Sequence, residues 1–170
     1  VLAHWLVTGF PLVLIAPALY ATWQFRSQQN AQIAFSAKER VGIEEIVPAQ
    51  RLLADLATAR SLAVGAAGRD GEAITALPAA RAAVTRSAAA LDAADARVGS
   101  RLGTRSMWRR LRASIGPTVA AEPVDAGRTL DAYGRLTAAT VALIVQAGNE
   151  SNLILDPDLD SYYVMDALVN

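Results

Sequence analysis

The 170-residue chain contains no cysteine and a single histidine, His4. The absence of cysteine excludes disulfides, thiolate metal sites and a cysteine nucleophile. One histidine, inside an apolar stretch, excludes a histidine-based zinc site and a Ser-His-Asp triad within this chain. Basic and acidic residues number 16 each, so the chain lacks the basic surplus of a nucleic-acid binder. We therefore expect no catalytic residue, no metal site, no cofactor and no nucleic-acid partner.

Strand signals are also missing, because no run of residues alternates β-branched side chains with polar ones. Hydrophobic residues make up 53% of the chain, and alanine contributes a large share of them. Alanine favours helix because it loses no side-chain entropy there. The sequence thus predicts an all-α fold.

Residues 1–25 carry no lysine, arginine, aspartate or glutamate. This length is sufficient for a helix to cross a hydrocarbon core of about 30 Å. Trp5 and Trp23 would lie roughly 27 Å apart along such a helix, which matches the aromatic belts at the two faces of a bilayer. We predict a transmembrane anchor at residues 1–25 that contacts membrane lipid. The alternative is a cleavable signal peptide, since residues 16–18 form an Ala-x-Ala cleavage pattern.

The next segment, residues 22–46, is polar and compatible with a helix. We expect it to continue the anchor outward as a stalk, with Glu44 and Glu45 facing water. Pro48 predicts a kink or a new helix start, because proline lacks the N–H that a helix interior needs. Residues 65–71 contain three glycines and predict a helix stop followed by a turn.

Three later segments repeat apolar or small side chains at alternating intervals of four and three residues, the pattern of a helix face packed against other helices. They begin near Pro48, Pro78 and Asp125, and residues 99–128 predict an irregular region with one short basic helix at 107–115. The three stripes are Leu52, Leu56, Ala59, Ala63 and Ala66; Ala80, Val84, Ser87, Leu91, Ala94 and Val98; and Tyr133, Leu136, Thr140, Leu143 and Ala147. The predicted architecture is a transmembrane helix that continues into an antiparallel, four-helix-type bundle.

The aspartates near the C-terminus predict the start of another helix. Asp156 is suited to the N-cap and Pro157 to the first helical position. The alternating aspartates of residues 156–160 look like the start of a calcium loop, but an EF-hand needs glycine at its sixth position and glutamate at its twelfth. Ser161 and Ala167 occupy those positions, so we predict no calcium site.

Two segments have a more specific sequence. Residues 35–63 read FSAKERVGIEEIVPAQRLLADLATARSLA, and residues 149–170 read NESNLILDPDLDSYYVMDALVN. Both resemble the extracytoplasmic sensor region of bacterial methyl-accepting chemotaxis receptors, a region that also occurs in sensor histidine kinases and diguanylate cyclases. Residues 59–61 depart from the family pattern, since Ala-Arg-Ser stands where a His-Arg-Gly-like sequence is expected. Residues 70–130 carry no such resemblance.

The resemblance implies the sensor region of a transmembrane signal-transduction receptor in the bacterial inner membrane. Residues 26–170 would form a periplasmic helical-bundle domain, truncated at its C-terminus, that relays the binding of an unknown small-molecule or protein stimulus by helix shifts. It also implies a homodimer with paired stalk helices, a second membrane span and a cytoplasmic output domain. The alternatives are the input region of a histidine kinase or diguanylate cyclase, and a structural membrane adaptor with no ligand. We expect no enzyme activity within this piece.

Four residues are candidates for contact with a stimulus. Arg109 and Arg112 lie in a basic cluster beside Trp108 that could receive a carboxylate or meet lipid headgroups. Tyr162 offers a ring for stacking, and Arg60 lies near a predicted helix end. Each also has a simpler interpretation: solvated arginines, a tyrosine in the core, and for Arg60 a favourable interaction with the helix dipole.

Overall fold

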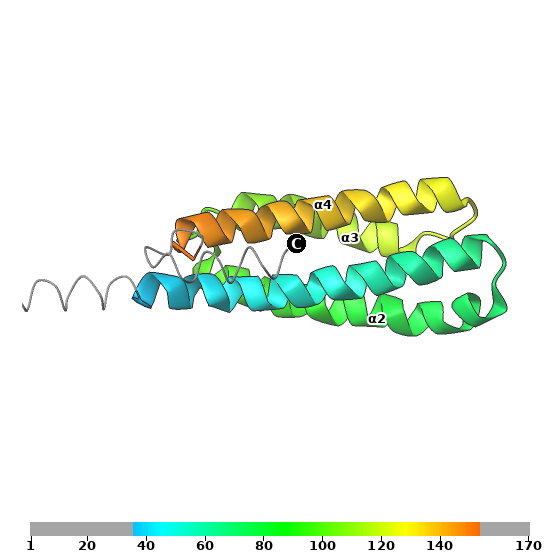
Figure 1. The fold of residues 1–170 in the computed structure, drawn as a ribbon, viewed down its shortest axis with the longest axis horizontal. Helices are drawn as coiled ribbons and strands as arrows, with labels where there is room; N and C mark the ends of the chain where they lie inside the picture. The colour runs from blue at the N-terminus through cyan, green and yellow to red at the C-terminus, as the bar shows by residue number, and fades with distance from the viewer. Residues whose placement is uncertain (1–35, 154–170) are drawn as a thin grey trace, which may run out of the picture. The chain divides into compact units, whose positions relative to one another are not determined.

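The computed structural model describes residues 36–153, and every regular element among them is helical. The first helix covers residues 36–67. It is followed by α2 (Gly71–Ala94), the π-helix η1 (Asp95–Gly99), α3 (Arg105–Ala120) and α4 (Ala126–Glu150) (Figure 1). The all-α prediction is confirmed for the described residues. Residues 39–153 belong to one compact unit, and we refer to them as the helical unit.

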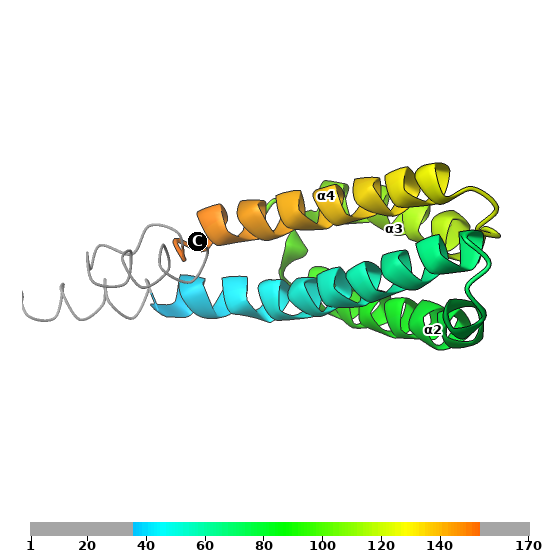
Figure 2. The ribbon, with the colours of Figure 1, turned by 45° about the vertical axis from the view of Figure 1, so that its right-hand side comes forward.

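The helices of the helical unit lie alongside one another (Figure 1, Figure 2). The turn at residues 68–70 and the segment 121–125 lie at one end, which we call the far end, and the connection 100–104 lies toward the other (Figure 1). Side chains from the first helix, α2, α3 and α4 meet in one apolar cluster. Burying a leucine in such a core contributes roughly 1.5–3 kcal/mol.

The three predicted stripes face the interior, with most of their apolar residues in this cluster and with Val98 and Ala147 in a second, smaller one. Leu52, Leu56, Ala59 and Ala63 are at most 1% exposed, and Ala66 is half-buried against the same cluster. The two remaining stripes are buried at every position, including Ser87 and Thr140. Both hydroxyls donate to backbone carbonyls of their own helix, Ser87 to Ala83 and Thr140 to Leu136. The spacing of small and apolar residues therefore identified the packed faces correctly.

The predicted helix start at Pro78 is wrong, because α2 begins at Gly71. Asp70 provides the cap: its side chain accepts from the backbone N–H groups of Glu72 and Ala73. Such a cap stabilises a helix by about 1 kcal/mol. Pro78 lies on the exposed side of α2 together with Ile74, so water can reach the Ile74 carbonyl that proline leaves without its N–H partner.

A new helix start at Pro48 is also wrong, since residues 36–67 form one uninterrupted helix. Its residues 42–46 face water only in part: Ile43 and Glu44 remain accessible, as a stalk would require. Glu45 is fully buried, which contradicts its predicted exposure. Gly42 is buried as well, and a Cβ there would lie 2.1 Å from the Ser151 hydroxyl. A glycine is therefore needed where the end of α4 approaches the first helix.

Residues 99–128 are more regular than predicted. The expected short helix at 107–115 is α3, which spans Arg105–Ala120 and buries Trp108, Leu111, Ile115 and Val119. The glycine and proline that suggest a break, Gly116 and Pro117, both lie on its exposed side. There a missing backbone hydrogen bond can be replaced by water.

Two predictions fall outside the described residues: the transmembrane anchor at residues 1–25, and Tyr162 together with its neighbouring aspartates. Within residues 36–153, no helix combines the length and apolar character that crossing a membrane requires.

Candidate functional site

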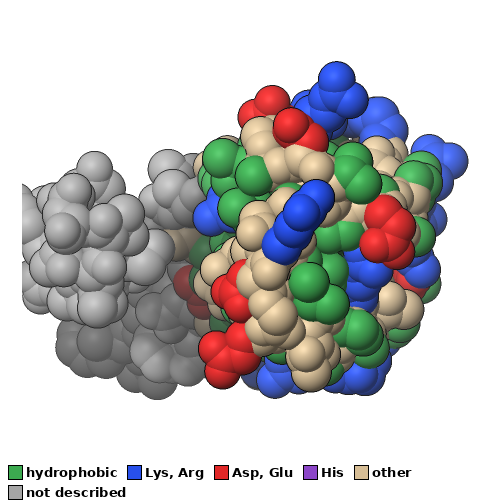
Figure 3. Space-filling model, turned by 90° about the vertical axis from the view of Figure 1, so that its right-hand side faces the viewer, with side chains coloured by type: hydrophobic (Ala, Val, Ile, Leu, Met, Phe, Trp, Pro, Cys, Tyr) green, Lys and Arg blue, Asp and Glu red, His purple; other side chains and the backbone are tan. Residues whose placement is uncertain are grey.

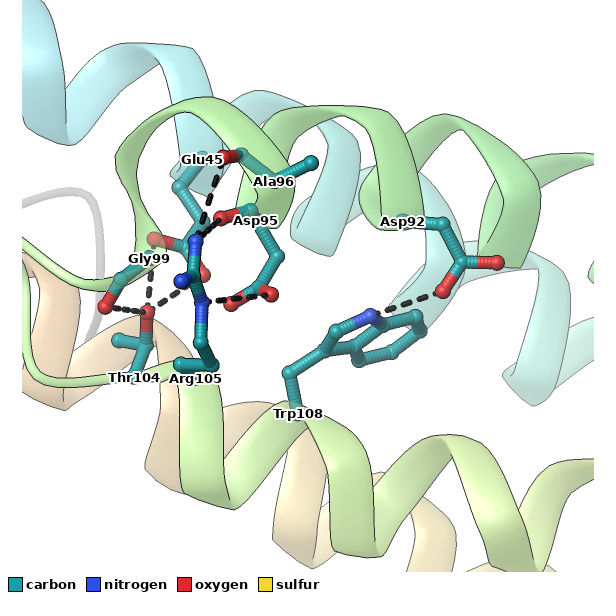
Figure 4. Close-up of polar contacts among 8 residues, drawn as sticks. All are labelled: Glu45, Asp92, Asp95, Ala96, Gly99, Thr104, Arg105 and Trp108. Atoms are coloured by element: carbon teal, nitrogen blue, oxygen red, sulfur yellow. Dashed lines mark hydrogen bonds and ion pairs between the residues drawn. The ribbon is translucent and has the colours of Figure 1, made fainter.

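A buried polar cluster lies at the corner where α2 leads into α3 (Figure 4). Glu45 comes from the first helix, Asp95 from η1, and Thr104 and Arg105 from the start of α3. Glu45 and Thr104 are fully buried, and Asp95 is 7% exposed. Buried charges of this kind are uncommon unless they are paired, so the arrangement of these side chains requires an explanation.

Thr104 holds the Glu45 carboxylate. Its hydroxyl oxygen lies 2.7 Å from one carboxylate oxygen and 2.9 Å from the other. The hydroxyl carries one proton and can donate to one oxygen at a time. Thr104 is the N-cap residue of α3, yet its side chain makes no capping bond. The hydroxyl is therefore directed to Glu45 rather than to the helix it begins.

The π-helix η1 sets the position of Asp95. A π-helix is one wide turn, and such turns are frequent at functional sites. In this turn Asp95, Val98 and Gly99 are all buried. A Cβ at Gly99 would lie 1.9 Å from the Asp95 side chain, so only glycine leaves room for the carboxylate. The wide turn and Gly99 together place a second acid in the corner.

Arg105 is the cation of the cluster. Its Nε lies 3.7 Å from the Asp95 carboxylate, and its Nη2 donates to the Asp95 and Ala96 carbonyls at 3.1 and 3.2 Å (Figure 4). The other carboxylate oxygen of Asp95 has no hydrogen-bond partner within residues 36–153. The arginine thus makes two hydrogen bonds to the backbone of η1 and only a longer ion pair to the Asp95 carboxylate.

Burial raises the pKa of the Glu45 carboxyl; the Thr104 hydrogen bond and the positive charge of Arg105 oppose this change, while the negative charge of Asp95 adds to it. Burial likewise raises the pKa of Asp95, with Arg105 and Arg109 lowering it and Asp92 raising it. Both acids therefore accept a proton more readily than they would in water. The cluster is a pair of buried acids whose protonation is linked to the packing of three helical segments.

Beside the cluster, Asp92 joins α2 to α3. One of its carboxylate oxygens accepts from Trp108 Nε1 at 2.9 Å (Figure 4), and the other accepts from Arg112 Nε at 3.0 Å. Arg112, a predicted ligand contact, is thus engaged within the fold. Arg109 is exposed on the same helix. The predicted basic cluster is therefore divided between internal partners and solvent.

Arg60 lies on the first helix and takes part in none of the ion pairs found within residues 36–153. Three hollows open on the surface of the described residues, with volumes of about 320, 370 and 210 Å³. Arg60, Arg109 and Arg112 line none of these three. The structure therefore does not bring the predicted contact residues together around any of these hollows.

The sequence analysis missed Glu45 as a buried residue, although a signal for it exists. The buried stripe of the first helix extends backward from Leu52 through Ala49, Glu45 and Gly42 with the same alternating spacing. A glutamate within a stripe of otherwise small and apolar residues indicates a buried carboxylate. Its partner Thr104 has no such signal, because the contact joins segments far apart in the chain.

The chain was compared with protein-family models, with curated proteins and with solved structures, and none of these comparisons yields a match.

Proposed function

We propose that this chain is the sensor region of a bacterial transmembrane receptor of the chemotaxis type, in which residues 26–170 form an antiparallel four-helix bundle in the periplasm. The proposal rests first on the resemblance of residues 35–63 and 149–170 to such sensor regions. A histidine kinase or a diguanylate cyclase could carry the same input region. The structural support comes from the first helix and its buried glutamate.

The observation that carries the proposal is the Glu45–Thr104 contact. The first helix runs without interruption from residue 36 to residue 67 and supplies both Glu45 and the apolar stripe from Leu52 to Ala63. If the first helix moved along its axis, the Glu45 carboxylate would lose its contact with Thr104. The apolar side chains of the stripe could still pack against the other helices after such a shift. Buried polar pairs can specify one alignment of packed helices, and two alignments of one packing are what a relay needs.

The topology can be tested directly because the chain has no cysteine. Thr85→Cys and Ala138→Cys place single thiols at exposed positions of α2 and α4. In intact cells expressing this chain, we expect both thiols to react with a membrane-impermeant maleimide. Ala88→Cys, at a fully buried position of α2, is the control and should react only after denaturation. Labelling of Thr85→Cys and Ala138→Cys only in broken cells would refute the periplasmic assignment.

The homodimer is part of the same proposal. Ile43 and Val47 lie one turn apart on the first helix and are 50% and 53% exposed, so this helix offers an apolar strip outside the core. We expect Val47→Cys to form a disulfide-linked dimer under mild oxidation of membranes, whereas Thr85→Cys should remain monomeric. Equal crosslinking at both positions, or none at Val47→Cys, would contradict pairing through this face.

A further inference from the structure

The surface groove between α3 and α4 is not used by the proposed relay. The two helices lie side by side (Figure 1, Figure 2), and the groove between them has a volume of about 320 Å³. One stripe of side chains from Met107 to Thr118 of α3 lines it, and a second stripe from Ala132 to Ala142 of α4 lies opposite. Ligand pockets have volumes of about 300–1,000 Å³, so the groove is large enough for a small molecule.

The lining of this groove contains positive but no negative charge. Arg110 of α3 and Arg135 of α4 lie on opposite walls, and both are exposed. Neither arginine takes part in an ion pair found within residues 36–153. Asp131, one turn before Arg135, is exposed and does not line the groove. The groove therefore favours an anion.

The hollow at the far end, of about 210 Å³, has a different charge. Glu122 and Asp125 line it together with Arg128. Figure 3 views the molecule from the far end, where acidic and basic side chains are interspersed. An anion there would meet carboxylates as well as a cation, so the far-end hollow is the poorer anion site.

Arg135 lies opposite Ser114 in the α3–α4 groove. Thr118 and Ala132 line both the groove and the far-end hollow, so they lie at about the same level of the antiparallel pair. At about 1.5 Å per residue, Ser114 is about 6 Å from that level and Arg135 about 4.5 Å from it. Arg110 lies one turn farther along α3. The two arginines thus flank one part of the groove from opposite walls.

The guanidinium groups are the available donors there. The Ser114 hydroxyl already donates to the Arg110 carbonyl of its own helix at 3.2 Å. Guanidinium groups form strong, charge-assisted hydrogen bonds with carboxylates. A carboxylate between Arg110 and Arg135 would therefore receive donors from both walls.

The groove beyond Arg110 is apolar. Met107, Ala139 and Ala142 line it there, and Met107 and Ala139 also pack against the buried core. From Ser114 to Met107, α3 rises by about 10 Å, which is sufficient for a short alkyl chain. The groove thus combines two cations with an adjoining apolar floor, and these features match an anion that carries an alkyl chain.

We propose that the α3–α4 groove binds a short-chain alkyl monocarboxylate. Arg110 and Arg135 donate to its carboxylate, and Met107, Ala139 and Ala142 contact its alkyl chain. Within the proposed function this groove would receive the stimulus, and that role rests on the proposed function. The binding itself does not.

Met107 allows the groove to be observed directly, because the chain contains only two methionines. The full chain, labelled with ¹³C at its methionine methyl groups and held in a zwitterionic detergent, is titrated with hexanoate and followed by NMR. Met165→Leu assigns the two signals. We expect a saturable shift of the Met107 signal, with a dissociation constant on the order of 1 mM or tighter. An unshifted Met107 signal would overturn the proposal.

Three other additives test the chemistry of the ligand. Hexylamine has the alkyl chain without the carboxylate, and acetate has the carboxylate with almost no chain. Both should bind at least about tenfold more weakly than hexanoate, because each lacks one of the two matched features. Equal binding of either would overturn the proposal. A Met107 shift with phosphatidylglycerol but not with hexanoate would assign the groove to a lipid headgroup and would also overturn it.

Two arginine variants identify the charged end of the site. Arg110→Gln and Arg135→Gln should each weaken hexanoate binding about tenfold. Arg109→Gln is the matched control, because Arg109 is exposed beside Arg110 on α3 but does not line the groove; it should leave the affinity unchanged. Since all three side chains are exposed, the fold should be retained. Unchanged affinity in either groove variant would refute the site.

The apolar end is tested by filling it. Ala142→Trp places a large side chain in the groove and should weaken hexanoate binding about tenfold or more. Ala138→Trp is the control, since Ala138 is also exposed on α4 but does not line the groove. Equal affinities in the two tryptophan variants would show that the alkyl chain lies elsewhere.

The outcomes separate this site from the receptor assignment. Hexanoate binding that depends on Arg110 and Arg135, combined with cytosolic labelling of Thr85→Cys, would keep the carboxylate site and refute the periplasmic sensor. The reverse combination, periplasmic labelling without hexanoate binding, would keep the sensor and refute the carboxylate site.

Discussion

The two ends of the helical unit handle buried polar groups in opposite ways. At the α2–α3 corner, acceptors are in excess: two carboxylates are buried, Thr104 donates to Glu45, and one oxygen of Asp95 has no partner among residues 36–153. At the far end, donors are in excess: the buried Tyr133 hydroxyl lies beside the Arg81 guanidinium. The first arrangement ties three helical segments together through carboxylates, whereas the second sets a hydroxyl beside a cation.

The largest effect is expected from Thr104→Val, which removes the donor to a fully buried carboxylate. Leaving a buried carboxylate without its hydrogen-bond donor costs about 3 kcal/mol, and no helix cap is lost, because the Thr104 side chain caps nothing. Chemical unfolding of the full chain, followed by circular dichroism, measures this. Thr85→Val is the control, since the Thr85 hydroxyl is exposed and bonds only to its own helix; a loss of similar size there would show that the Glu45 contact is not responsible.

A smaller loss is expected from Gly99→Ala. The added methyl group would meet the Asp95 carboxylate at 1.9 Å, and overpacking of this kind costs about 1–3 kcal/mol. Gly116→Ala is the matched control, since nothing lies within 4 Å of its Cβ position in α3; it should stabilise the protein by up to about 1 kcal/mol. The comparison uses the same unfolding assay. If the two substitutions shift stability in the same direction, the crowded turn at η1 is not as described.

Glu45→Gln tests the electrostatics of the corner. Because burial raises the pKa of Glu45 above its usual 4.5, the folded state favours the protonated form. The stability from this preference is fully present below the usual pKa and is lost as the pH rises through the folded-state pKa. The glutamine variant should therefore gain stability relative to the parent at pH 7 and lose that advantage near pH 4. A constant difference across this range would contradict the raised pKa.

The smallest effect belongs to the far end. Tyr133→Phe should leave the stability of the chain within about 0.5 kcal/mol of the parent, or raise it slightly, because the lost hydroxyl makes no well-aligned hydrogen bond within residues 36–153. Thermal unfolding measures this. A marked loss would mean that the hydroxyl is already paired within the protein, and the contrast with Thr104 would disappear.

The packed faces could be predicted from the sequence, because the residues of each face lie three or four positions apart in one segment of the chain. The stripe from Ala80 to Val98 is fixed by the helical repeat alone, and each of its members is buried. Helix ends were harder: Pro78 and Pro117 suggest breaks, but both lie on exposed sides where a lost hydrogen bond costs little. Asp70, which caps α2, was not predicted as a cap, because the glycines around it indicate only a turn.

The pairings within the polar sites could not be predicted, because the partners are distant in sequence. Asp92 engages Trp108 and Arg112 of the next helix, and this removes Arg112 from the surface cluster that its local sequence suggests. Arg81 of α2 and Tyr133 of α4 come close only once the whole helical unit has folded. Nothing in the spacing of either segment identifies the other.

The unbroken helix of residues 36–67 also has a geometric consequence. At about 1.5 Å per residue it is a rod of roughly 48 Å, and each residue turns it by about 100°. Removing one residue between Glu45 and Leu52 would therefore turn the glutamate by that angle relative to the apolar stripe. The register of the buried carboxylate against Thr104 is thus set by the number of residues that separate it from the packed leucines.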